Sequence, residues 1–575
     1  MKIRGTSLLY LGLIVLLSFC AGFIVLQTKA QSSQGESHVV VYLHGRIYTN
    51  DPAQPWADAM AIRDGKIRCV GKIDYVLLEC GGNDPGAETI QLKGKFVMPG
   101  FNDAHVHLGA AGAGLLSVPL NGVPSIEELQ KRVAGAVAHH KEGEWITGFG
   151  WDHTLWADKK FPNKQELDAV APKNPVFLVH VSGHVAVANT LALVHGEIKP
   201  DTPNPPGGMI ERDADGAATG MLEEDSAMSL VSARIPDLKI DQRRRGIQMV
   251  LADAAKNGVT SVQDFSDWSD YLVYVQLKEE GKLTLRITEW LPFLLPINEL
   301  LNMRAQGGTT DPWLKTGALK AFTDGALGSR TAAMLAPYSD DPSTSGILTN
   351  DPEKLRAMAI ERDKAGFQLN FHAIGDHANR VALDVFEAVA KANGPRDRRD
   401  RVEHAQVLAP EDLPRFAQLK VIASMQPSHE TTDMRWAGQR VGPDRSKGAY
   451  AWASLQKSGA RLAFGTDYPV EPLNPLRGLY ACVTRELPDG GPAGGWQPQE
   501  KISLDDCIRA YTSGSAYAQF EEGKKGELKA GEYADFIILS DDLTKIPPQQ
   551  FTKTTVLLTV VGGRTAYTPD GSPFR

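Results

Sequence analysis

The chain has 575 residues, with 61 basic and 69 acidic side chains and a formal net charge of −8. This length is enough to bury a large core and predicts more than one domain. Hydrophobic residues make up 42% of the sequence and charged residues 23%, which is typical of a globular protein and not of a disordered one. No basic cluster is long enough to follow a phosphate backbone, so the sequence excludes a nucleic acid as partner.

The first 37 residues have the order of an export signal followed by a polar tail. Lys2 and Arg4 precede an apolar run over residues 8–26, and a polar segment over 27–37 comes next. Ala30 ends a usable cleavage site, so we predict a signal peptide and export to the periplasm or the outside of the cell. The run also reaches the roughly 20 residues that span a bilayer, so a retained membrane anchor is the alternative. We expect membrane contact only through this segment, if it stays uncleaved.

Four cysteines follow the signal, namely Cys69, Cys80, Cys482 and Cys507. Their spacing matches no zinc-binding motif. Free cysteine is among the most buried residue types, so we predict buried, unpaired thiols. A disulfide between Cys69 and Cys80 is the alternative in an oxidising compartment.

Both ends of the chain predict β-structure. Short alternating apolar segments separated by turns fill residues 38–95, and the same pattern returns over 525–575. Neither piece is long enough to bury a core alone. We therefore predict that 38–95 and 525–575 meet in one composite β-sandwich.

Between these ends, helical and strand patterns alternate. Helices are predicted near 241–257, 351–365, 377–393 and 503–518. The predicted strands lie near 96–101, 259–263, 284–290, 316–322, 367–372, 400–404, 420–425 and 461–465. Eight strands in such a series indicate an α/β fold, a (β/α)₈ barrel of the TIM type over 96–524, with its active site at the carboxyl ends of the strands. Residues from about 115 to 235 break the alternation, and we interpret them as an insertion that caps the barrel mouth.

Metal-binding side chains stand at the ends of several predicted strands. Because alternate side chains of a strand share a face, His105 and His107 point the same way. Later strand ends contribute Lys320, His372, His404 and Asp467. Each has an ordinary alternative: a lone buried histidine can simply be hydrogen-bonded, and an aspartate can cap a helix. Lys320 is the most informative, because a buried ammonium is costly unless it is paired or neutralised.

Four segments resemble a known family: KAFTDGALGSR (320–330), FHAIGDHAN (371–379), VEHAQ (402–406) and GTDYPV (465–470). Together with the His-x-His pair, they are similar to the amidohydrolase superfamily, and to its amidohydrolase 3 branch of N-substituted formamide deformylases. The resemblance covers about residues 38–567. It implies a metal-dependent hydrolase barrel flanked by a terminal β-sandwich.

The resemblance also implies a site. The site would hold a divalent metal, namely two zinc ions. Its ligands would be His105, His107, Lys320, His372, His404 and Asp467. Carbon dioxide would convert Lys320 to a carbamate that bridges the two ions. Asp467 would move the proton of a metal-activated water, and His372 or a second metal would polarise the scissile carbonyl. The residues expected near a small-molecule substrate are Asp324, Arg330, Trp151 and His184, with a structural pair between Asp324 and Arg330 as the alternative.

The function predicted from these residues is hydrolysis of a non-peptide carbon–nitrogen bond in an amide or formamide. The same site could instead attack a cyclic amide, a deaminable ring or an ester. From another class, the chain could be an exported binding protein on an inactive hydrolase scaffold. That reading is disfavoured because all six ligand positions hold competent residues. A homodimer is left open.

Overall fold

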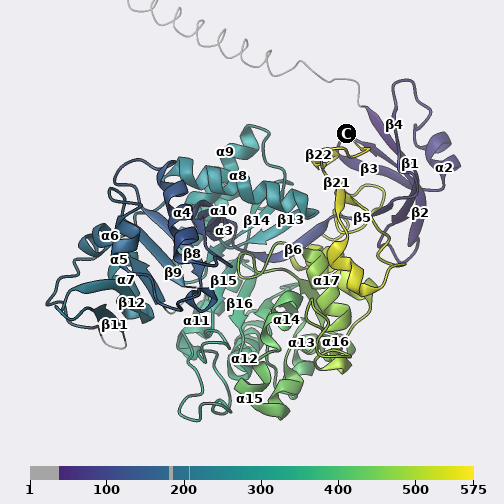
Figure 1. Cartoon of the computed structure of the whole chain (residues 1–575). Helices are drawn as coiled ribbons and strands as arrows, with labels where there is room; N and C mark the ends of the chain where they lie inside the picture. Colours follow the sequence, from purple (N-terminus) through teal and green to yellow (C-terminus); the bar gives the residue numbers. More distant parts are fainter. Residues whose placement is uncertain (1–37, 181–184, 206–207, 575) are drawn as a thin grey trace, which may run out of the picture.

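A computed structural model describes residues 38–180, 185–205 and 208–574 of the chain. Its centre is a barrel of parallel strands (Figure 1). In the order of the sheet from β6 to β19, these are β6 (Phe101–Val106), β13 (Val259–Asp264), β14 (Arg286–Pro292), β15 (Leu314–Phe322), β16 (Leu369–Ala373), β17 (Arg401–His404), β18 (Ile422–Met425) and β19 (Arg461–Phe464). Most of their residues are buried, as expected for strands covered on both faces. The predicted (β/α)₈ barrel is confirmed.

The barrel closes at its mouth, where the segment after β19 meets the end of β6. The amide of Asp467 donates to the carbonyl of His105 over 2.8 Å, and the amide of His107 donates to the carbonyl of Tyr468 over 2.8 Å. The Asp103 carboxylate accepts from the amide of Thr466 over 2.9 Å. The backbone that closes the barrel therefore also brings Asp467 beside His105, near the end of β6, and His107, which follows it.

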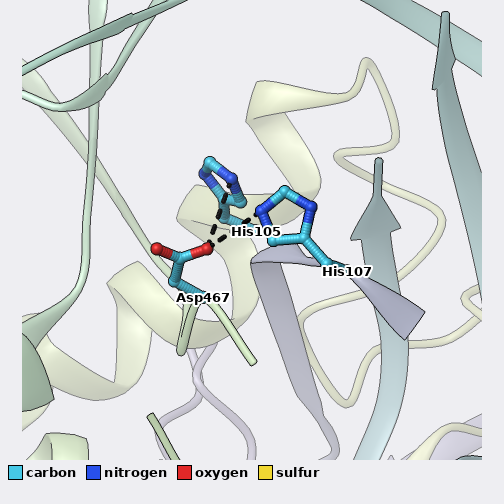
Figure 2. A group of neighbouring side chains, drawn as sticks. All are labelled: His105, His107 and Asp467. Atoms are coloured by element: carbon cyan, nitrogen blue, oxygen red, sulfur yellow. Dashed lines mark ion pairs between the residues drawn. The ribbon is translucent and has the colours of Figure 1, made fainter. Parts of the chain in front are cut away.

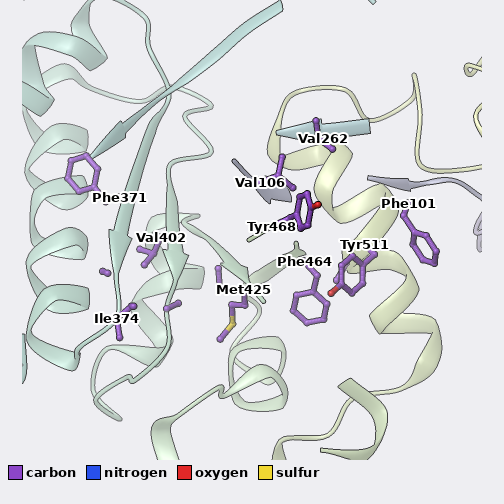
Figure 3. Close-up of a cluster of buried hydrophobic side chains, with 14 of the residues drawn as sticks. Phe101, Val106, Val262, Phe371, Ile374, Val402, Met425, Phe464, Tyr468 and Tyr511 are labelled. Carbon is purple, nitrogen blue, oxygen red and sulfur yellow. The ribbon is translucent and has the colours of Figure 1, made fainter. Parts of the chain in front are cut away.

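Helices surround the barrel strands. They are α3 (Leu108–Leu116), α8 (Ile240–Lys256), α9 (Trp268–Glu279), α10 (Ile297–Gly307), α11 (Pro352–Lys364), α12 (Asp376–Asn393), α13 (Leu413–Leu419), α14 (Pro427–Asp433), α15 (Ala437–Arg445), α16 (Trp452–Lys457), α17 (Pro475–Thr484), α18 (Leu504–Arg509) and α19 (Ser515–Ala518). In α12, the buried residues Ala378, Val381, Ala382 and Val385 recur at helical spacing and face the barrel. Figure 3 shows part of the core that barrel strands and helices share; Phe371 and Tyr511 are two of its residues.

The predicted insertion forms a separate sheet beside the barrel. Its strands pair in the order β11, β12, β10, β9, β8, β7. They are β7 (Val118–Pro119), β8 (Ile146–Trp151), β9 (Val176–His180), β10 (Val185–Ala188), β11 (Met209–Arg212) and β12 (Ala218–Glu223), with helices α4 (Ile126–Val137), α5 (Lys164–Asp168), α6 (Thr190–His195) and α7 (Glu224–Ser232). In Figure 1 this blue sheet lies on the side of the barrel opposite to the terminal sheet.

Strands from both ends of the chain form the terminal sheet. They are β1 (Val39–Tyr48), β2 (Trp56–Arg63), β3 (Lys66–Gly71), β4 (Glu88–Gln91), β5 (Phe96–Pro99), β20 (Phe536–Leu539), β21 (Val556–Val561) and β22 (Arg564–Tyr567), accompanied by helix α2 (Ile73–Glu79). β5 is the junction, because it pairs with β1 on one side and with β20 on the other. Hydrogen bonds join all eight strands in one sheet.

One predicted strand, 96–101, is in fact two. Residues 96–99 belong to the terminal sheet as β5, and the barrel begins only at Phe101. At the break, a Cβ on Gly100 would lie 2.2 Å from the side chain of Thr260. The chain passes so close to β13 there that only glycine fits, and it changes sheets at this residue.

A buried ion pair fastens the terminal sheet to the barrel. Arg286 of β14 donates to both carboxylate oxygens of Asp535, from Nε over 2.6 Å and from a terminal nitrogen over 2.9 Å. Both side chains are 4% exposed. Such a pair contributes little net stability when intact, but breaking it leaves a buried charge without a partner.

Replacing Asp535 with alanine is therefore expected to lower the free energy of unfolding by about 3–5 kcal/mol. Urea denaturation followed by circular dichroism measures the change. The matched control is Asp541→Ala, at an exposed position nearby, which should shift stability by no more than about 0.5 kcal/mol. Equal midpoints for the two variants would contradict this role of the ion pair.

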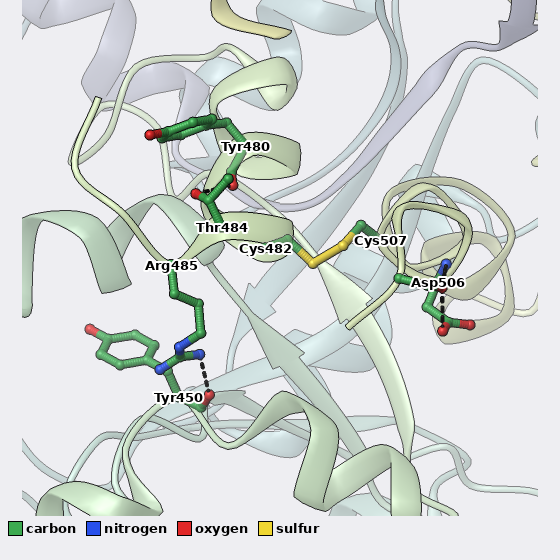
Figure 4. The surroundings of a disulfide bond; sticks show 8 residues. Tyr450, Tyr480, Cys482, Thr484, Arg485, Asp506 and Cys507 are labelled. Atoms are coloured by element: carbon green, nitrogen blue, oxygen red, sulfur yellow. Dashed lines mark hydrogen bonds between the residues drawn. A yellow bond between two sulfur atoms is a disulfide. The ribbon is translucent and has the colours of Figure 1, made fainter. Parts of the chain in front are cut away.

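The four cysteines are paired, and the prediction of free thiols is wrong. Cys69 pairs with Cys80 in the terminal sheet domain, and Cys482 of α17 pairs with Cys507 of α18 (Figure 4). Within the described ranges, no helix is long and apolar enough to cross a membrane. The predicted signal segment, residues 1–37, lies outside the described residues.

Candidate metal centre

Two histidines and an aspartate meet at the barrel mouth (Figure 2). His107 Nε2 lies 3.1 Å from Asp467 Oδ1, and His105 Nε2 lies 3.6 Å from the same oxygen. His105 is fully buried, and Asp467 is 6% exposed. His105 lies near the end of β6 and His107 follows directly after it, and their ring centres are 5.2 Å apart on one side of the chain, as predicted.

Hydrogen bonds fix which nitrogen of each ring faces Asp467. His105 donates from Nδ1 to the Glu403 carboxylate over 2.8 Å, and His107 donates from Nδ1 to the carbonyl of Phe265 over 2.9 Å. A neutral imidazole has a single N–H, so each Nε2 presents a lone pair to Oδ1. A cation between these atoms would be held by all three of them. The donor set therefore fits a divalent metal ion, with Glu403 and the carbonyl as outer supports.

Burial keeps these rings in the form that binds metal. It lowers the pKa of His105 well below 6.5, and the nearby Lys320 lowers it further. Burial likewise lowers the pKa of His404, with a further contribution from His372. Both rings are therefore neutral at pH 7 and keep a lone pair for a metal.

A second donor group shares Asp467. His404 and His429, together with Asp467, each offer one ligand atom within 4.8 Å of the others. His404 donates from Nδ1 to Gln426 Oε1 over 2.8 Å, and His429 Nε2 lies 3.6 Å from Asp467 Oδ2. His429 was not predicted. The sequence feature that could have identified it is its position four residues after β18. However, His429 stands on α14 and not at the strand end itself.

Lys320 and His372 complete the set that the strand ends predicted. Lys320 Nζ lies 3.0 Å from His105 Nε2, and burial lowers the pKa of Lys320 to about 8. The rings of His372 and His404 lie 4.6 Å apart. His372 donates from Nε2 to the carbonyl of Gly325 over 3.1 Å, which leaves Nδ1 as the free ligand atom. The structure thus brings all six predicted ligands to one mouth. Because the N–H of His372 is used by the Gly325 carbonyl, His372 is suited to act as a ligand through Nδ1 and not to donate to the scissile carbonyl.

The structure gives contacts for three of the four residues expected near the substrate, Asp324, Arg330 and Trp151. Asp324 accepts from the amides of Ala333, Ile374 and Gly375 over 2.8–3.0 Å, so it holds loops together. Arg330 pairs with Asp340 over 3.1 Å, not with Asp324.

Trp151 is buried in the core of the insertion, where its Nε1 donates to the carbonyl of Leu178 over 3.0 Å. Trp151 is therefore part of that core, and Asp324 Oδ1 lies 3.3 Å from Nε2 of the predicted ligand His372, whereas Arg330 is engaged at the surface by Asp340. His184 lies outside the described residues.

The contact of Gln426 with His404 gives a testable prediction about metal affinity. Gln426 is buried, and its Nε2 has no hydrogen-bond partner among the described residues, so Gln426→Leu removes only the acceptor for His404. Loss of such a supporting contact is expected to weaken zinc binding by about 10–100-fold. Competition with a chelating dye measures the affinity. Gln426→Glu keeps an acceptor and should bind zinc as the wild type does; equal affinity for the leucine variant would refute the role.

The fold and the site together define a class of protein, the barrel hydrolases that work with a metal. The fold is a (β/α)₈ barrel, and its mouth gathers imidazoles, a lysine and an aspartate around a cation site. Within this class, the profile described as "Amidohydrolase family" matches residues 88–567, and the chain belongs to that family. It is accordingly a hydrolase that acts on carbon–nitrogen bonds other than peptide bonds.

Individual relatives extend over nearly the whole chain. Protein LONG AFTER FAR-RED 3 of Arabidopsis thaliana is 39% identical over 540 residues, which are 91% of each chain. An N-substituted formamide deformylase of Arthrobacter pascens is 27% identical, over 93% of this chain and 99% of its own. The crystal structure of an uncharacterized metal-dependent hydrolase from Pyrococcus furiosus superimposes with a TM-score of 0.73 at 31% identity, over 89% of this chain and 100% of that one.

Proposed function

We propose that the protein hydrolyses a linear amide or formamide, with two zinc ions at the barrel mouth and water as the nucleophile. One observation carries this proposal: the Asp467 carboxylate lies among imidazoles on two sides, His105 and His107 on one and His404 and His429 on the other. Imidazole and carboxylate are the ligands of catalytic zinc sites, and two donor groups that share one carboxylate suit two ions. The similarity to a formamide deformylase supports the choice of substrate class.

Zinc held by His105, His107, His372, His404, Lys320 and Asp467 would supply water whose pKa is lowered towards about 7, a nucleophile available at neutral pH. Asp467 takes the proton of the attacking water at a carboxylate oxygen and gives it to the departing nitrogen. His429 would join His404 and Asp467 as a ligand of the second ion, because its buried Nε2 lies 3.6 Å from Asp467 Oδ2 and has no hydrogen-bond partner in the described part of the chain. That ion would supply the charge that polarises the scissile carbonyl.

Lys320 takes part as a carbamate. The neutral amine attacks carbon dioxide, a nitrogen–carbon bond forms, and one proton leaves to solvent. Burial lowers the pKa of Lys320 to about 8, which makes the neutral amine accessible, and the contact with His105 supports a position for the new anion beside the ligands. The product would offer two oxygens as metal ligands, where an amine offers a single lone pair.

A substrate panel, assayed with and without zinc, tests the proposal. Formamides, linear amides, cyclic amides, amino-substituted rings and esters are compared after treatment with a chelator and again after zinc is restored. We expect the highest kcat/KM for a formamide or linear amide, its loss with the chelator and its return with zinc. A preference for rings or esters would favour the first alternative, and tight binding with no turnover would favour a binding protein; either result overturns the proposal.

We also propose that the protein is exported and that its first 30 residues are removed. The two disulfides support an oxidising compartment, since such bonds are rare in the cytosol of mesophiles. Sequencing of the purified protein's N-terminus should find a start near Gln31, in protein recovered from outside the cytoplasm. A soluble cytosolic pool that begins with Met1 would refute the proposal.

A further inference from the structure

The insertion has a second cluster of metal-binding side chains, far along the chain from the barrel ligands. β8 and β9 are neighbouring parallel strands, and Trp151 at the end of β8 lies opposite His180 at the end of β9. Asp152 and His153 follow directly after β8. Carboxyl ends of parallel strands meet at one edge of a sheet, which is where α/β sheets place their ligands. Two imidazoles and a carboxylate are therefore brought to the same edge.

Their ligand atoms are close enough to share one ion. Asp152, His153 and His180 each offer one atom within 4.8 Å of the others, as His105, His107 and Asp467 do in the barrel. Asp152 Oδ1 and His180 Nε2 are 3.8 Å apart, and the rings of His153 and His180 are 5.5 Å apart. His153 Nδ1 is shielded from solvent and has no hydrogen-bond partner within the described residues. Bonds of about 2.0–2.2 Å to a metal require only small rotations of these side chains.

Aromatic rings enclose the cluster. Trp151 packs edge-on against His180 with ring centres 4.6 Å apart, and Phe161 lies 4.1 Å from the ring of His153. His180 is 9% exposed, so water reaches it poorly. These walls restrict the two imidazoles to a few orientations and reduce the entropy that an ion must overcome to order them.

We propose that Asp152, His153 and His180 form a second divalent transition-metal site, separate from the barrel centre. Two of its three protein donors are imidazoles, which select zinc or cobalt over calcium or magnesium. A solvent molecule completes the tetrahedron. A metal here ties the loop after β8 to the end of β9 and so links the carboxyl ends of two neighbouring strands of the insertion.

Counting metal ions in the whole protein tests the site. The full chain is stripped with a chelator, dialysed against buffered cobalt and analysed by mass spectrometry of the metal. His153→Gln/His180→Gln should hold one equivalent of cobalt per chain less than the wild type and hydrolyse substrate at the wild-type rate. The control is His139→Gln/His195→Gln, which removes two exposed histidines of the same insertion and should change nothing.

Hydrogen exchange locates the ion independently of activity. Zinc should slow exchange in the peptide of residues 146–155 at least tenfold in the wild type, but not in His153→Gln/His180→Gln. Exchange near residues 464–468 should slow in both, because the barrel centre is unchanged. If the double variant folds poorly, the same measurements are made on the single variant His153→Gln, which changes only one half-buried turn. Equal metal content in variant and wild type, with no zinc-dependent protection of 146–155, overturns the proposal whether or not the enzyme is active.

Discussion

Asp467→Asn is expected to lower turnover by about two to four orders of magnitude or more, while most of the bound metal stays in place. An amide cannot take a proton from water, and general acid–base catalysis alone contributes about 10²–10⁴-fold. The other ligands still surround the site, since Lys320 and the four histidines do not depend on this carboxylate for their position. Steady-state kinetics and metal analysis of the same preparation measure both quantities.

The control for this experiment is Asp340→Asn. It removes the same charge from an aspartate that pairs with Arg330 and Arg440 at the surface and does not face the metal centre. Because exposed ion pairs contribute about 0–1 kcal/mol, its kinetics should match the wild type. Near-normal turnover of Asp467→Asn with a full complement of metal would show that another group moves the proton.

Lys320→Ala should lose tight binding of at least one metal ion, and activity by more than about 100-fold, since even supporting contacts of a metal site are worth 10–100-fold. Acetate or propionate should restore part of both, because a short carboxylate fits the vacated space and supplies two oxygens. Enzyme equilibrated with ¹³C-labelled carbon dioxide should show a carbamate signal that the variant lacks. Activity titrations with zinc and carboxylate measure the rescue.

The alternative for Lys320 is a lysine that only packs or forms a pair. It predicts no rescue, no carbamate signal and a bare amine when metal is bound. Lys320→Met tests the packing, because methionine fills nearly the same volume without a nitrogen. If this variant kept its metal and activity, Lys320 would be a structural residue.

The strand ends of the barrel were predictable because two simple patterns coincide there. Short apolar runs mark buried parallel strands, and polar residues directly after them must lie at one mouth. His105, His372, His404 and Asp467 all follow this rule. The structure brings them together as the sequence indicated.

Residues that reach the mouth from elsewhere could not be identified in this way. His429 stands on a helix after β18, and its direction depends on where α14 begins. Glu403 alternates with the ligand face of β17 and reaches His105 across the barrel interior. Such contacts depend on barrel closure, which no local pattern encodes.

The predictions of loop contacts and of sheet boundaries were wrong for related reasons. Arg330 has three aspartates nearby along the chain, Asp324, Asp340 and Asp341, and only the folded loop selects Asp340 as its hydrogen-bonded partner. The run over 96–101 is apolar throughout, so hydropathy cannot show that it serves two sheets. Gly100 was the available signal, since glycine inside a strand often marks a close approach or a sharp bend.

The junction strand β5 has a consequence for how the protein is made. Its partner β20 begins at Phe536, about 440 residues after Phe96, so at about 5–20 residues per second a ribosome needs roughly 20–90 s to supply it. Throughout that time the apolar segment Phe-Val-Met-Pro has an unpaired edge, which other chains can join. The terminal sheet can therefore be completed only after synthesis has nearly ended.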